Sequence, residues 1–247
     1  MAHTEVFDDL EAEQQQLETV LAGLGPADWA TPSAAAGWSV ADVLLHLAQT
    51  EEAVTATVSE QGDPVRWHEL GATVDEAMGA LVEAERGDGP EIFARWRVAR
   101  RESVAALRAA DPARPVRWVA TPLKPRTLAT TRLAEHWAHA FDITVPLGID
   151  YPDTARLRHV AWLGLSTLPY AFRLAGLPPV AVRAELTAPD GSTWHLGDPS
   201  AGNVITGPAG DFCRVGAQRL PPADTKLEAT GPDAASALRL LRNYAVS

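Results

Sequence analysis

The sequence has 247 residues, of which 46% are hydrophobic, and a formal net charge of −11. This length suits one large domain or two ordinary ones, and the acidic balance argues against nucleic-acid binding, which relies on clustered Lys and Arg. Its single cysteine, Cys213, excludes an intramolecular disulfide. No stretch resembles an export signal or a membrane span, so we expect a cytoplasmic protein without membrane attachment.

Two helices are predicted in the first 60 residues. Apolar residues at helical spacing indicate the first over residues 5–24. The second begins after Ser39, which can accept amide hydrogen bonds as an N-cap, with Asp42 three residues later as in a capping box. Within this helix His46 lies beside an apolar stripe. A lone histidine is weak support for a metal ligand, because a partly buried histidine that hydrogen-bonds its neighbours is the ordinary alternative.

Helical patterns continue over residues 74–85 and 91–110, and a proline-rich connector leads to a further helix over residues 127–145. We expect Pro146 and Gly148 to stop this last helix. Apart from the shorter stretch over residues 74–85, the first half therefore contains four principal helices and is predicted to form a bundle, in which facing helices can project ligands into a shared core.

The helix over residues 127–145 carries a metal-site pattern. Glu135, His139 and Asp142 stand at positions i, i+4 and i+7, which places a carboxylate, an imidazole and a second carboxylate on one face. Such residues bind zinc and similar divalent ions, although another ligand must come from elsewhere in the chain. Asp142 could orient a ligating histidine, act as a base or join a local polar network. His136 lies about 100° around the helix from Glu135 and is predicted to be a surface or packing residue.

These motifs resemble a known family. Gly-Trp-Ser-Val at residues 37–40 precedes the helix with His46, and Leu-x-Glu-x-Trp-x-His-x-x-Asp occupies residues 133–142. Together they resemble the DinB-like bundle of the mycothiol-dependent maleylpyruvate isomerase superfamily, and most closely an actinobacterial branch of metal-binding proteins. The likeness continues through residues 158–161, 185–191 and 206–213, so it covers nearly the whole chain.

The resemblance implies a divalent metal held by His46, Glu135 and His139, with positions open for water or a thiolate. Zinc is the first candidate for this metal. It further implies a low-molecular-weight thiol cosubstrate such as mycothiol, and a small electrophilic substrate that is isomerised or receives the thiol. Asp142 is expected first to hold a metal-bound histidine in place. Monomer and homodimer are both compatible with the sequence.

The second half has a mixed pattern. A helix is predicted over residues 152–174, followed by alternating apolar and polar residues from 180 to 187 that indicate a half-buried strand. Further strands and helices are predicted over residues 193–196, 203–206, 208–218, 226–230 and 232–244, with a hairpin turn at 189–192. The predicted fold class is α+β: a DinB-like four-helix bundle (1–150) and a small α+β domain (151–247) that resembles sterol-carrier-like folds and is expected to close over the bundle site.

Candidate functional residues in the second half are weaker. Arg219 could bind a substrate carboxylate, although an exposed, salt-bridging arginine is commoner. His159 and His195 are equally weak candidates for functional residues. Cys213 is expected to be a buried, inert thiol. Two alternatives to the thiol enzyme remain. One is a thiol-independent metal enzyme, such as a hydrolase, lyase or cyclase; the other is a non-catalytic metal or small-molecule binding module.

Overall fold

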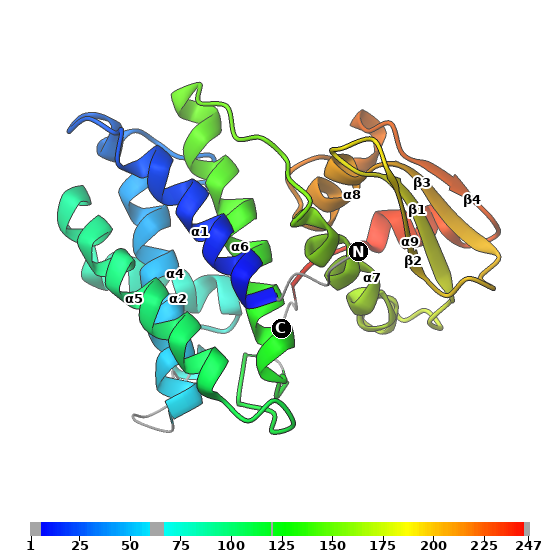
Figure 1. Cartoon of the computed structure of the whole chain (residues 1–247), viewed down its shortest axis with the longest axis horizontal. Coiled ribbons are helices and arrows are strands. Elements are labelled where there is room, and N and C mark those ends of the chain that lie inside the picture. The colour runs from blue at the N-terminus through cyan, green and yellow to red at the C-terminus, as the bar shows by residue number, and fades with distance from the viewer. Residues whose placement is uncertain (1–5, 60–66, 120, 245–247) are drawn as a thin grey trace. The chain divides into compact units, whose positions relative to one another are not determined.

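The computed structural model describes residues 6–59, 67–119 and 121–244, and Figure 1 shows its helices and strands. The chain divides into two compact units between Tyr151 and Pro152. The fold is mixed α+β, because the first unit is built on helices and the second combines helices with a small four-stranded sheet. None of the described helices is long and apolar enough to span a bilayer.

The first unit is held together by four long helices, α1, α2, α5 and α6, which pack against one another (Figure 1). Leucines that point inward from each of them, such as Leu10, Leu44, Leu107 and Leu128, are removed from solvent and form its core. The helices of this unit are α1 (Val6–Leu21), α2 (Val40–Ser59), α3 (Trp67–Leu70), α4 (Val74–Glu85), α5 (Gly89–Ala109) and α6 (Pro125–Leu147).

The start of α2 is fixed by the predicted capping box. The Asp42 amide donates to Ser39 Oγ at 3.2 Å, and the Ser39 amide donates to Asp42 Oδ2 at 2.9 Å. These two bonds satisfy amide groups that have no partner within the helix. They set where α2 begins and so place His46 four residues beyond Asp42 on the same face. The predicted end of this helix at residue 60 lies outside the described residues.

Helix α6 is longer at both ends than predicted. Pro125 occupies the first turn, where the missing amide costs nothing. Pro146 was expected to stop the helix but lies in its last turn, so this prediction was wrong. Gly148 ends the helix instead, with a φ of 65° that glycine adopts without steric cost, and its amide donates to the carbonyls of Thr144 and Val145.

The second unit contains a sheet with strand order β2-β1-β3-β4. The predicted hairpin is confirmed, because β1 and β2 pair antiparallel with Leu186 opposite Trp194. Strand β3 pairs parallel with β1 and antiparallel with β4. The elements are α7 (Leu157–Leu174), β1 (Val182–Thr187), β2 (Thr193–Gly197), β3 (Asn203–Pro208), α8 (Ala209–Gly216), β4 (Glu228–Thr230) and α9 (Ala234–Leu240).

One face of this sheet is buried. Val182, Ala184 and Leu186 of β1 are buried, whereas the intervening Arg183 and Glu185 are not, as the alternating pattern predicted. Helices α7, α8 and α9 all contact the sheet or each other in this unit.

The last helix of the second unit is shorter than predicted. α9 ends at Leu240, and the Asn243 amide then donates to the Gly216 carbonyl at 2.8 Å. Leu241, which directly follows the end of α9, is fully buried. Tertiary contacts therefore overrule the helical pattern at this end of the chain.

Candidate metal centre

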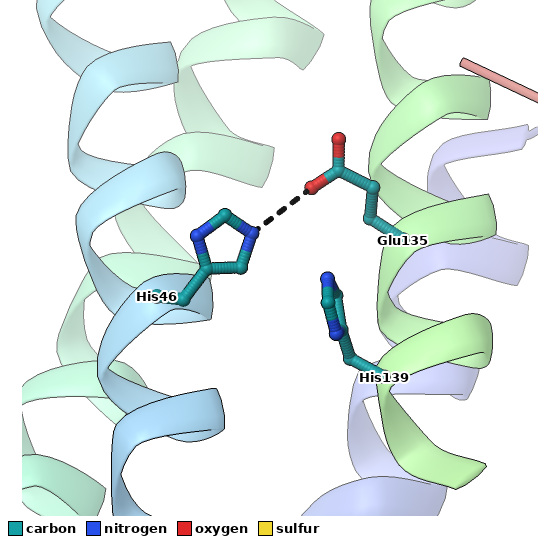
Figure 2. Close-up of side chains that lie close together, drawn as sticks. All are labelled: His46, Glu135 and His139. Carbon is teal, nitrogen blue, oxygen red and sulfur yellow. Dashed lines mark ion pairs between the residues drawn. The ribbon is translucent and has the colours of Figure 1, made fainter. Parts of the chain in front are cut away.

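Three side chains from two helices converge in the first unit. His46 of α2 points toward Glu135 and His139 of α6 (Figure 2). With one donor atom taken from each residue, the three atoms lie within 4.8 Å of one another. His46 Nε2 and Glu135 Oε2 are 3.8 Å apart, too far for a hydrogen bond. We call these three residues the ligand cluster; the structure brings together the residues that the sequence had singled out.

The donor atoms of the ligand cluster fit a divalent cation. Two imidazoles and one carboxylate are ligands that zinc uses, and two ligands of one tetrahedral zinc ion lie about 3.4 Å apart. The 3.8 Å between His46 and Glu135 is of this size. Burial lowers the pKa of His46 more than the nearby Glu135 carboxylate raises it, so its imidazole is neutral, which is the form that binds metals. Three protein donors leave further coordination positions open.

His139 is held in place by Asp142. The ring Nδ1 of His139 lies 2.9 Å from Asp142 Oδ2, and the Asp142 side chain is 1% exposed. Since an ionised carboxylate only accepts hydrogen bonds, Nδ1 carries a proton, and Nε2 is the ring nitrogen left to bind an ion. A carboxylate in this position fixes both the tautomer and the direction of a ligating histidine.

Glu135 contacts a buried charge pair, Arg132 and Glu51, that was not predicted from the sequence. Arg132 and Glu51 are both fully buried, and Arg132 Nε donates to Glu51 Oε1 at 2.7 Å. Arg132 Nη1 donates to Glu135 Oε2 at 2.8 Å, and Nη2 donates to Thr50 Oγ1 at 2.6 Å. Burial alone would raise the pKa of Glu135, but the Arg132 guanidinium and the nearby imidazoles outweigh it and hold this pKa well below its usual range. Glu135 therefore carries an ionised carboxylate.

His136 packs beside this charge pair and is not part of the ligand cluster. It is fully buried: its Nε2 accepts from Trp96 Nε1 at 3.2 Å, and its Nδ1 donates to the Arg132 carbonyl at 2.9 Å. Burial, reinforced by the Arg132 charge, lowers its pKa to about 4 despite the opposing Glu51 carboxylate. His136 is thus a neutral packing residue with both ring nitrogens engaged.

The ligand cluster falls within a recognised sequence family. The profile of the mycothiol maleylpyruvate isomerase N-terminal domain matches residues 10–144, which is more than half of the chain and includes all three residues of the cluster. The chain belongs to this family. It is also 36% identical over 245 residues to the uncharacterized proteins Rv0036c and MT0041 of two Mycobacterium tuberculosis strains, a match that spans 96% of this chain and 94% of theirs.

Solved structures of the maleylpyruvate isomerase family share the fold of this chain. Mycothiol-dependent maleylpyruvate isomerase matches with a TM-score of 0.62 and 14% sequence identity, and the match covers 91% of each chain. A histidine-to-alanine mutant of that enzyme matches with a TM-score of 0.61 at 12% identity, over the same share of both chains. At these identities the comparison shows a common fold.

The other candidate functional residues predicted for this chain, Arg219, His159 and His195, lie in the second unit. Arg219 follows α8, is exposed, and donates through Nη1 to the Ala217 carbonyl at 2.9 Å. His159 is half-buried on α7 and His195 is exposed on β2. None of these three belongs to the ligand cluster, which lies wholly in the first unit.

Cys213 is fully buried in α8, with its Sγ 3.6 Å from the Leu157 carbonyl. Burial raises the pKa of its thiol well above the usual value, so the reactive thiolate is suppressed. We expect no reaction of Cys213 with a chromogenic disulfide reagent in the folded protein, and one equivalent of reacted thiol after denaturation. Absorbance during the reaction measures this. Rapid stoichiometric labelling of the folded protein would show that Cys213 is accessible and contradict the inert assignment.

A groove of about 640 Å³ lies in the first unit, at the N-terminal end of α2. Its walls come from the loop before α2 and from the turn between α4 and α5, and include Trp29, Trp38, Asp42 and Arg86. The ring of Trp38 is 5.2 Å from that of His46, centroid to centroid. None of the three residues of the ligand cluster lines the groove, and Trp38 is the lining residue whose ring lies near His46; the groove has the volume of a small-molecule site.

Proposed function

We propose that this chain is a divalent-metal-dependent enzyme that activates a low-molecular-weight thiol, with mycothiol as the first candidate. The activated thiol would isomerise a small electrophile or be transferred to it. The observation that carries the proposal is the convergence of His46, Glu135 and His139 across α2 and α6, inside a domain of the mycothiol maleylpyruvate isomerase family. The name of the solved neighbour, a mycothiol-dependent isomerase, supports the same reaction class.

In this proposal the protein supplies a preset donor set for zinc or a similar ion. His46 offers a neutral imidazole nitrogen and Glu135 an ionised carboxylate, while the hydrogen bond from His139 Nδ1 to Asp142 leaves Nε2 as the donor atom of His139. When bound, the divalent ion supplies Lewis acidity, which lowers the pKa of a coordinated thiol and favours its thiolate near neutral pH. The groove beside Trp38 offers room for the organic part of the thiol or the substrate.

The remaining features of the proposal come from the family. We assign the first unit to a DinB-like four-helix bundle and the second to a sterol-carrier-like α+β domain of a cytoplasmic enzyme. Asp142 is the candidate base as well as the partner of His139. Arg219 is the candidate for binding a substrate carboxylate, since a guanidinium can hold both carboxylate oxygens.

Metal and thiol binding by the wild-type protein test this function directly. Protein purified without chelator is expected to contain close to one divalent ion per chain, measured by elemental mass spectrometry. Mycothiol should bind the metal-loaded protein in calorimetric titration and bind the chelator-stripped protein much more weakly. Stoichiometric metal without thiol binding would favour the thiol-independent enzyme, and a protein that neither contains nor takes up metal would overturn the proposal.

A further inference from the structure

A layer of buried polar side chains lies between α2, α5 and α6, next to the ligand cluster. Glu51 of α2, Ser103 of α5 and Arg132 of α6 are all fully buried. Ser103 Oγ donates to Glu51 Oε2, and Arg132 Nε donates to the other oxygen of the same carboxylate. Full charges are removed from water only at a high cost, so this pair depends on its mutual attraction and on the hydrogen bonds around it.

The three contacts of Arg132 reach both helices of the metal site. Its Nε and Nη2 bind Glu51 and Thr50 of α2, while Nη1 binds Glu135 on its own helix. The oxygen that it holds, Glu135 Oε2, is the one 3.8 Å from His46 Nε2. The planar guanidinium has a rigid arrangement of donors, so these bonds fix how the Glu135 carboxylate is turned and how α6 sits against α2.

Charge balance gives Glu51 a separate role. Glu51 and Glu135 each contribute −1 and Arg132 contributes +1, so these three side chains sum to −1, and Asp142 adds a further carboxylate beside His139. Without Glu51, the Arg132 charge would cancel that of Glu135, and the Asp142 carboxylate behind His139 would be the remaining negative charge close to a divalent cation. In a buried environment such a change has a large electrostatic effect.

We propose that Glu51 and Arg132 form a charge-balanced clamp on the metal ligand Glu135. Arg132 is a positioning residue that fixes the carboxylate, and Glu51 is the counter-charge that leaves this carboxylate available to a divalent cation. The inference rests on the proposed metal function and deepens it, because it names two residues that set the cation affinity of the site without contacting the ion.

Cobalt(II) binding tests the clamp, with Glu51→Gln as the central variant. Glutamine keeps the shape of Glu51 and an oxygen for Arg132 Nε, but it removes the charge. We expect the Co²⁺ affinity, measured by titration of the visible absorption band, to fall about 10–100-fold. Arg132→Lys replaces the three-way contact with a point charge, so the Co²⁺ spectrum itself should change as Glu135 reorients.

Glu52→Gln is the matched control. Glu52 is the next residue on α2 and also pairs with an arginine, Arg95, but it is 42% exposed and this pair does not reach the ligand cluster. The Co²⁺ affinity of the Glu52→Gln protein should stay within twofold of that of the wild type.

A folded Glu51→Gln protein with wild-type affinity would overturn the clamp while leaving the metal site intact. If that variant does not fold, an unchanged affinity and spectrum in Arg132→Lys would overturn the clamp. A wild-type protein that binds no Co²⁺ would overturn the metal site and the clamp with it.

Discussion

Replacement of Arg132 by methionine is expected to lower the free energy of unfolding by about 3–5 kcal/mol. The methionine fills the space of the arginine stem, but Glu51 is left fully buried without its cationic partner. Water cannot reach this carboxylate to compensate, and only Ser103 still donates to it among the contacts described above. Urea denaturation followed by circular dichroism measures the loss as a shift of the midpoint at constant slope.

Two further variants separate this buried pair from an ordinary ion pair. The double variant Glu51→Leu/Arg132→Met removes both fully buried charges and should recover most of the lost stability, because the carboxylate that still loses its partner, Glu135, is 33% exposed to solvent. Arg95→Met, which breaks the partly exposed ion pairs of Arg95 with Glu52 and Glu85, should cost only about 0.2–1 kcal/mol for each pair. Equal losses in Arg132→Met and Arg95→Met would show that burial of the Glu51 charge carries no special penalty.

The sequence predicted those parts of the fold that depend on neighbouring residues. The Ser39–Asp42 capping box and the alternation along β1 are local patterns, and the structure confirms both. The parallel pairing of β1 with β3 was not predicted, because it depends on how the segment between them packs. Leu241 and Asn243 show the same limit, since helical periodicity there yields to contacts with distant residues.

The candidate site also contains a part that local spacing predicts and a part that it does not. Glu135, His139 and Asp142 share one helix face, so their spacing alone places them together. His46 comes from another helix, and only the family resemblance connected it to them.

The buried pair of Glu51 and Arg132 was not predicted from the sequence, although the chain carries a signal for it. Glu51 interrupts the apolar stripe of Leu47 and Val54 on α2, and a charge within such a stripe implies a buried partner. The partner itself, Arg132, lies 81 positions away, and no local spacing identifies it.

His139→Ala should weaken Zn²⁺ binding by roughly 100-fold or more. The variant removes one of three protein donors, and if the total binding free energy of a protein zinc site is shared among its ligands, each contributes about 3 kcal/mol or more. It also leaves Asp142, which is 1% exposed, without the imidazole that donates to it. Competition with a chromophoric chelator gives the Zn²⁺ affinity, and elemental analysis of the purified variant gives its occupancy.

His195→Ala controls for the general loss of a histidine, because His195 is exposed on β2 and lies outside the ligand cluster; its Zn²⁺ affinity should match wild type. His139 is 16% exposed, so its truncation removes less buried surface than a core substitution would, and the variant should retain its circular dichroism spectrum. Loss of metal from a folded protein is then attributable to the missing donor. If His139→Ala instead binds Zn²⁺ as wild type does, the ion lies elsewhere, and the approach of His46 to Glu135 is a charge contact within the helical core.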